Sequence, residues 1–264
     1  MSGNNDFVLV NERGWRRGFG NMLRSELSRW WGTRMWWIQC LIWGGMIGFV
    51  VGAILFSGET VSEEEVLMIF SIFIGLFPSV AVAIIMQDVL VGEKREGTAA
   101  WVLSKPLTRP AFILSKVLAN SLGVLVTMVI VPAAITFFLF WIAEKTTFDL
   151  AGFLPALGVF FANHFFFLTL TLMMGAFFNA RGPVIGLPLA VLFLQQNLIG
   201  FVPFLGYILP WNLVVPLNGN ESSSLAVSLI LGQPVQSYNL LFVVLAESII
   251  FLAIGLWRFN REEF

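Results

Sequence analysis

The sequence predicts an all-α integral membrane protein with six membrane-spanning helices. Of its 264 residues, 58% are hydrophobic and 12% are charged, which is too little charge for the surface of a soluble protein of this size. The charges fall in blocks separated by apolar runs, and a run of about 20 residues crosses a hydrocarbon core ~30 Å thick as a helix. A net charge of -1 gives no reason to expect a nucleic-acid partner. One cysteine and one histidine exclude a disulfide framework and a multi-cysteine metal site, so no metal is expected.

We expect two parts: a cytoplasmic N-terminal segment, residues 1–34, and a single transmembrane domain, residues 35–264. Between residues 15 and 31, apolar side chains recur at helical spacing, with arginines mostly on the opposite side. This pattern predicts an amphipathic helix that lies in the headgroup layer of the membrane. An ordinary amphipathic helix packed on protein is the alternative. The apolar face consists of Trp15, Phe19, Met22, Leu23, Leu27, Trp30 and Trp31.

Six apolar runs define the spans. The expected spans are residues 35–56, 66–86, 111–143, 153–178, 184–206 and 240–257. Pro78 predicts a kink in the second span, because proline removes a helical hydrogen bond. Thr108 is a candidate N-cap for the third span, which has Pro110 in its first turn.

The segment between the fifth and sixth spans, residues 207–239, contains two apolar stretches that are too short to cross a membrane. Prolines and a glycine interrupt it. We expect short re-entrant or interfacial helices packed on the outer mouth of the bundle, because non-helical backbone at that depth must be covered by protein. A soluble extracytoplasmic cap is the alternative.

The basic residues indicate how the chain is oriented. With six spans, every lysine and arginine except Lys145 falls on the same side of the membrane. The positive-inside rule therefore predicts that both termini and the segment between spans two and three lie in the cytoplasm. We expect a multi-pass protein of the plasma membrane.

A charged segment, residues 88–116, separates the second and third spans. Residues 93–96 are all charged, with both signs, and could make contacts at the rim of a protein interface. Trp101 and Leu103 add an aromatic and an aliphatic side chain of the type that anchors interfaces. A solvated loop with Trp101 as a membrane anchor is the alternative interpretation.

The stretch GEKREGTAAWVLSKPLTRPAFILSK in this segment resembles the membrane (permease) subunit of type-2 ABC transporters, the ABC-2 family. The residues that carry the resemblance are Glu93, Gly97, Thr98, Leu103, Pro106, Arg109 and Lys116. The layout of amphipathic helix, six spans and apolar outer segment is similar to that family over nearly the whole chain. Ala99 and Ala100 depart from it, because bulkier or acidic residues are frequent there in the family.

The resemblance implies that the loop between spans two and three forms a coupling helix, which docks in a cleft of a separate cytoplasmic ABC ATPase. It implies two permease subunits, as a homodimer or a heterodimer, and two ATPase subunits. ATP and Mg would be bound by the ATPase, and no cofactor by this chain. The expected coupling residues are Glu93, Lys94, Arg95, Glu96, Thr98, Trp101, Leu103 and Arg109.

The chain itself is not expected to be an enzyme. A phosphate loop requires a lysine after a glycine-rich turn, and the sequence contains no Gly-Lys pair. We therefore expect a permease, working as an exporter, that uses ATP hydrolysed on another chain.

Few polar side chains interrupt the spans. Glu247 is the only acid deep within a span, which makes it a functional candidate, although a hydrogen-bonded helix contact would also account for it. The resemblance places spans two and five at the dimer interface and substrate pathway. We assign to that pathway Gln195, Gln196, Asn197, Glu247 and Asn163, with Phe73, Phe77 and Phe201 as an apolar wall. The lone His164 is expected to be a packing residue.

Other functions stay open at this stage. An ion-coupled secondary transporter is compatible with Glu247, and a non-transporting membrane scaffold is compatible with the layout. An intramembrane protease would need paired aspartates or a serine in a Gly-x-Ser-x-Gly frame, and the spans contain neither. The apolar interior suits an amphiphilic cargo such as a lipid, a drug or a hydrophobic peptide.

Overall fold

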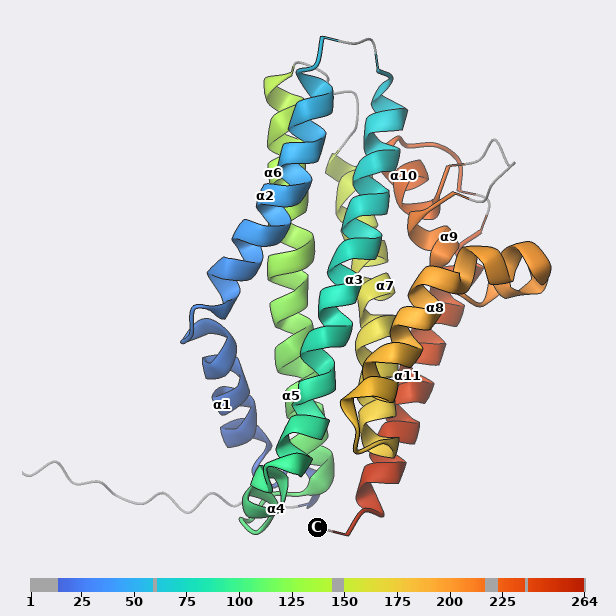
Figure 1. Ribbon diagram of the computed structural model, residues 1–264. Coiled ribbons are helices and arrows are strands. Elements are labelled where there is room, and N and C mark those ends of the chain that lie inside the picture. The colour runs from blue at the N-terminus through green and yellow to red at the C-terminus, as the bar shows by residue number, and fades with distance from the viewer. Residues whose placement is uncertain (1–13, 59–60, 144–149, 217–222, 236, 264) are drawn as a thin grey trace, which may run out of the picture.

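The computed structural model describes residues 14–58, 61–143, 150–216, 223–235 and 237–263. Within these residues, six helices are long and apolar enough to cross a membrane, which confirms the six predicted spans. They are α2 (Met35–Leu55), α3 (Glu63–Arg95), the continuous stretch Arg109–Ile142, α7 (Leu150–Phe177), α8 (Arg181–Phe201) and α11 (Asn239–Asn260). Figure 1 shows them as an elongated bundle, with the C-terminus and the short helix α4 (Thr98–Leu103) at one end. The first 13 residues and Lys145 lie outside the described residues.

The second span is longer than its apolar run. A capping box starts α3, in which the Ser62 side chain accepts from the Glu65 backbone and Glu65 bonds back to Ser62. The helix then continues through Pro78 and ends at Arg95, before Gly97 takes a left-handed conformation with φ 70°. Its 33 residues measure about 50 Å, whereas the hydrocarbon core is about 30 Å thick. The first half of the charged segment is therefore the end of this helix rather than a loop.

The third span consists of α5 (Arg109–Val124), a π-helical stretch at Leu125–Ile130, and α6 (Val131–Ile142). The π-helical stretch precedes Pro132, which has no backbone N–H to continue the regular α-helical ladder. At the other end, the Thr108 hydroxyl accepts a hydrogen bond from the Ala111 backbone at 3.3 Å, which confirms the predicted N-cap.

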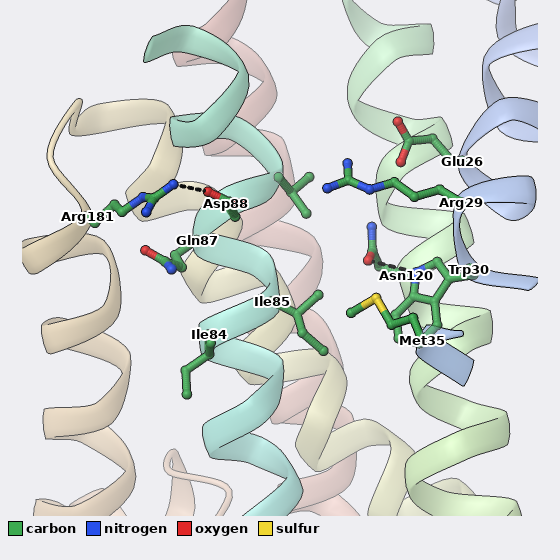
Figure 2. Close-up of a pocket in the computed structure, with 11 residues that line it drawn as sticks. Glu26, Arg29, Trp30, Met35, Ile84, Ile85, Gln87, Asp88, Asn120 and Arg181 are labelled. Carbon is green, nitrogen blue, oxygen red and sulfur yellow. Dashed lines mark hydrogen bonds and ion pairs between the residues drawn. The ribbon is translucent and has the colours of Figure 1, made fainter. Parts of the chain in front are cut away.

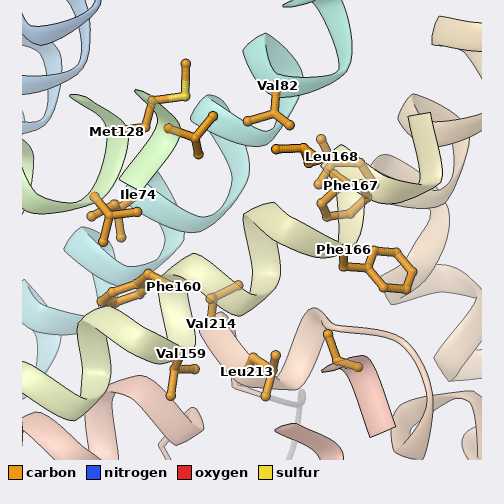
Figure 3. Packing of buried hydrophobic residues seen from close by; sticks show 14 of the residues in the cluster. Ile74, Val82, Met128, Val159, Phe160, Phe166, Phe167, Leu168, Leu213 and Val214 are labelled. Carbon is orange, nitrogen blue, oxygen red and sulfur yellow. The ribbon is translucent and has the colours of Figure 1, made fainter. Parts of the chain in front are cut away.

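The core lies around α7, which packs against α3, α8, α11 and α10 (Leu225–Ile230). Phe70 of α3 meets Phe160 of α7 edge to face, with ring centroids 5.6 Å apart. Figure 3 shows Phe160 of α7 near Ile74 of α3 and Val214 of α9 (Trp211–Val214). The spans are thus held together by interlocking large side chains.

The segment after the fifth span is helical in short pieces. The α8 helix ends at Phe201, five residues earlier than predicted, because Pro203 starts a 3-10 turn at Pro203–Tyr207. Both α9 and α10 pack on α7. Trp211 and Val227 are buried, so these pieces join the core instead of forming a separate cap.

The N-terminal helix α1 (Phe19–Trp31) lies along α5, and the two run in the same direction. The Thr108 hydroxyl donates to the Trp15 carbonyl at 2.6 Å, and the Trp30 indole donates to Asn120 at 3.0 Å. Contacts that lie further along α1 therefore also lie further along α5. Figure 1 shows α1 beside α5 near the base of the bundle. A Cβ at Gly123 would lie 2.5 Å from the Trp30 ring, so the close approach requires glycine.

One flank of α1 therefore packs on protein, as in the alternative interpretation. Trp30 is buried and Phe19, Leu23 and Leu27 are partly buried, whereas Trp15 and Trp31 are exposed. Contact of this helix with membrane headgroups stays a prediction, for which the exposed tryptophans are suitable.

Candidate coupling site

The end of the bundle that carries α4 contains the charged segment. Gly97, in the left-handed region, separates α3 from α4, and Pro106 and the N-cap Thr108 separate α4 from α5. These breaks turn the chain twice within a few residues, so α4 lies beyond the ends of the two spans that it connects (Figure 1). Charged side chains in this region point either into the bundle or out of it.

Glu93 points into the bundle. It meets Lys116 of α5, whose Nζ lies 2.5 Å from Glu93 Oε1 and 2.6 Å from Oε1 of Glu26 in α1. The Lys116 side chain has no exposed surface. One buried ammonium thus joins three helices, and removing one partner from such a group typically costs about 3–5 kcal/mol. Sequence analysis did not find Glu26, because it lies 90 residues from Lys116 and no local pattern connects the two.

Lys94 and Arg109 also point inward. Lys94 Nζ lies 2.7 Å from a carboxylate oxygen of Glu262 and donates to the carbonyls of Gly175 and Ala176, near the end of α7. Arg109 donates to the carbonyl of Asn260, the last residue of α11, at 2.6 Å. Cations at helix C-termini compensate the carbonyls that lack helical partners. These two residues fasten the charged segment to α7 and α11.

The outward side of the segment is different. Arg95, Glu96, Thr98 and Trp101 are exposed. Arg95 and Glu96 form no hydrogen bond or ion pair through their side chains with the described residues, while the Thr98 hydroxyl donates to the Glu93 carbonyl. The Trp101 ring is 63% exposed, and its only cation partner in the described part of the chain is Lys105, 3.5 Å from the ring centroid.

Two residues of α4, Leu103 and Ala99, pack against the rest of the subunit. Leu103 is half-buried and packs against the core, and Ala99 is 1% exposed. The small side chain at position 99 is therefore enclosed, whereas Ala100 is exposed. A cavity of about 480 Å³ opens beside α4, lined by Lys94, Arg95, Gly97, Ala100, Asn179, Glu262 and Glu263.

The residues assigned to a substrate pathway do not form one cluster. Gln195 is fully buried and Gln196 and Asn197 are exposed. Asn163 is buried inside the subunit, where it donates to the Gly75 carbonyl at 2.8 Å and to the Ser79 hydroxyl at 3.2 Å. His164 lies beside the same residues, with its Nδ1 2.9 Å from the Ser79 hydroxyl oxygen. The two α7 side chains thus surround the turn of α3 that contains Pro78, which favours a structural role for both.

Glu247 and the phenylalanine wall occupy other positions. One carboxylate oxygen of Glu247 is enclosed and has no hydrogen-bond partner among the described residues. Phe73 and Phe77 are stacked, with centroids 5.0 Å apart, and Phe77 is 44% exposed on the surface of α3. Phe201 is 85% exposed at the end of α8.

Comparison with known protein families gives a match over most of the chain. A profile described as "ABC-2 family transporter protein" matches residues 42–264. The chain belongs to the ABC-2 family. A search among curated proteins finds no match. As an ABC-2 type permease, this multi-pass membrane protein is a component of a transporter, and membership implies association with an ABC ATPase.

Proposed function

We propose that this permease is the membrane subunit of an ABC exporter of the plasma membrane and that α4 is its coupling helix. The ATPase, which binds ATP and Mg, docks on the outward side of α4 in the cytoplasm. The observation that carries this proposal is the division of one short segment into two sides. Its exposed Arg95 and Glu96 have no side-chain hydrogen bond or ion pair with the described residues, while its buried charges connect it to the other helices.

The outward side has the chemistry of a docking surface. Trp101 offers a large exposed ring, and aromatic residues are common anchors of protein interfaces. Arg95 and Glu96 offer one charge of each sign at its rim, which suits orientation of a partner. The cavity beside α4 could receive a side chain from that partner.

The inward side offers a route for motion. A displacement of α4 acts directly on the end of α3, which Glu93 links to α5 and α1 through Lys116. Lys94 links the same end to α7 and to Glu262, beyond α11. Because these contacts are short and enclosed, α3 cannot move independently at its base. ATPase closure would therefore move several spans together.

The substrate pathway would lie along α3 and α8, between two permease subunits. The less buried positions of α3 recur at helical spacing along one side, including Phe73, Phe77 and Ile84, so the described residues leave an apolar stripe partly exposed. Gln196 and Asn197 would add the polar groups of this pathway. An apolar wall with few polar groups suits an amphiphilic cargo. Two permeases and two ATPases would form the transporter.

Copurification tests the docking surface. An affinity-tagged permease from its native cells is expected to retain an ABC ATPase, identified by mass spectrometry. The double variant W101A/E96K should lose it while keeping normal yield, because both side chains are exposed. The control is W141A, which removes a tryptophan of similar exposure, 61%, from the end of α6. Retention of the ATPase by the double variant would refute docking on α4.

Disulfide crosslinking tests the pairing of permeases. Cys40 is the only cysteine, so a C40S background is free of thiols. A cysteine at Gln196, which is exposed, should crosslink two permeases, whereas one at the enclosed Gln195 should not. A monomer in both variants would contradict the proposed pathway between two subunits.

A further inference from the structure

A second cavity lies away from α4, between α1, α3, α5 and the start of α8. It has a volume of about 240 Å³, below the roughly 300–1,000 Å³ of most pockets for drug-sized ligands. Its lining residues are Glu26, Arg29, Trp30, Met35, Ile84, Ile85, Gln87, Asp88, Val89, Asn120 and Arg181. We propose that it binds the headgroup of a phospholipid that carries both a phosphate and a primary ammonium, such as phosphatidylethanolamine.

The cavity lies where two of the spans begin. Met35 and Arg181 are the first residues of α2 and α8, so both helices begin at its wall. The side chains of Ile84 and Ile85 lie below the polar groups in Figure 2, where α3 continues into its apolar part. Ile84 is 49% exposed. Headgroup chemistry therefore adjoins an apolar surface suited to an acyl chain.

Arg29 supplies the group for the phosphate. Figure 2 shows its guanidinium extending from α1 toward α3, while Asp88 and Gln87 point from α3 to the side that carries Arg181. The Arg29 guanidinium forms no hydrogen bond or ion pair with any residue in the described part of the chain, unlike that of Arg181, which is paired with Asp88 at 2.6 Å. Guanidinium groups bind phosphate through two parallel hydrogen bonds. Basic pockets between spans are known to hold lipid headgroups.

Gln87 supplies the group for the ammonium. The Gln87 residue is only 9% exposed, and its buried side-chain oxygen has no hydrogen-bond partner among the described residues. Asp88 uses Oδ1 for Arg181, and its carboxylate is 46% exposed, so Oδ2 can accept from a second donor. A primary ammonium can donate to both acceptors. The quaternary ammonium of phosphatidylcholine has no N–H and would leave the amide oxygen unpaired.

The charges around the cavity favour a headgroup with no net charge. Glu26 faces the cavity but is already paired with Lys116, which also binds Glu93. Glu26 and Glu93 carry two negative charges against the one positive charge of Lys116, and Arg29 balances the second. Arg181 balances Asp88. A lipid that brings one negative and one positive charge preserves this balance. An anionic lipid without an amine would add a negative charge that no remaining cation of the site balances.

Lipid binding can be measured on the purified permease without an ATPase, so failure here is distinct from failure of the proposed coupling. In native mass spectrometry with lipids of equal chain length, phosphatidylethanolamine should bind about tenfold more tightly than phosphatidylcholine or phosphatidylglycerol. The soluble headgroup glycerophosphoethanolamine should bind more weakly than the lipid. Equal retention of the three lipids would overturn the headgroup assignment, and equal binding of the soluble form would overturn the role of the acyl chain.

Two variants and one control assign the effect to the cavity. R29Q should reduce binding of phosphatidylethanolamine about tenfold, whereas R24Q, an exposed arginine of α1 outside the cavity, should leave it unchanged. Q87L should abolish the preference for phosphatidylethanolamine over phosphatidylcholine, and it decides the question if R29Q does not fold. Unchanged binding in R29Q, or an unchanged preference in Q87L, would refute the site.

Discussion

The inward and outward sides of the segment from Glu93 to Arg109 are built from the same residue types but differ in every contact. The inward Glu93 and Lys94 each have a partner 2.5–2.7 Å away in another part of the subunit. The outward Arg95 and Glu96, next in the sequence, have none among the described residues. A charge that is satisfied within the subunit holds the subunit together, and a charge that is not can serve a partner. Substitutions on the two sides should therefore separate folding from coupling.

The largest expected effect is at Lys116. K116M leaves two carboxylates, those of Glu26 and Glu93, without their shared cation, and should lower the free energy of unfolding by about 3–5 kcal/mol. Denaturant-induced unfolding in detergent measures this. The matched control is K105M on the exposed side, which loses only the contact with the Trp101 ring and should change stability by less than about 1 kcal/mol. Equal stability of the two variants would remove the distinction between the sides.

A smaller loss is expected at Lys94. K94M removes the ion pair with Glu262 and two hydrogen bonds to carbonyls of α7, which should cost about 2 kcal/mol. Because the contacts fasten the C-terminal tail, limited proteolysis should also cleave after residue 258 faster than in the wild type. A tail as resistant as before would show that Lys94 does not hold it.

The N-cap of α5 should contribute about half as much to the free energy of unfolding as the contacts of Lys94. T108A removes the hydroxyl that accepts from Ala111 and donates to the Trp15 carbonyl, with an expected cost of about 1 kcal/mol. T98A is the comparison, since its hydroxyl is exposed and makes one bond to the Glu93 carbonyl. Thermal unfolding of the two variants should rank T108A below T98A, and the reverse order would contradict the capping role.

The smallest effect on folding, with a large effect on coupling, is expected at Glu96. E96K should leave stability within about 0.5 kcal/mol of wild type and weaken retention of the ATPase, because the charge is exposed and faces away from the bundle. E93K is not an equivalent test of docking, since it places a second cation against Lys116. Loss of folding in E96K, or normal ATPase binding, would refute the assignment of the outward side.

Local rules predicted some of these elements well. The six spans follow from apolar runs, and Thr108 was recognised because an N-cap needs only its own side chain and the next turn. The direction of individual charges was not predictable in the same way. Adjacent helical residues point about 100° apart, so Lys94 and Arg95 meet different surroundings although both are basic and stand side by side in the sequence. The same rotation separates buried Gln195 from exposed Gln196.

The amino-acid sequence by itself determined the membrane class, the six spans, the short helix between the second and third, and the family, because hydropathy and motif spacing are local properties. Only the tertiary structure decided which of these charges are paired within the subunit and which are exposed. It also revealed the ion pairs of Lys116 with Glu26 and Glu93 and the cavity at Arg29, since both combine residues from helices that are distant in the chain. Proximity of this kind arises from packing, which no run of neighbouring residues encodes.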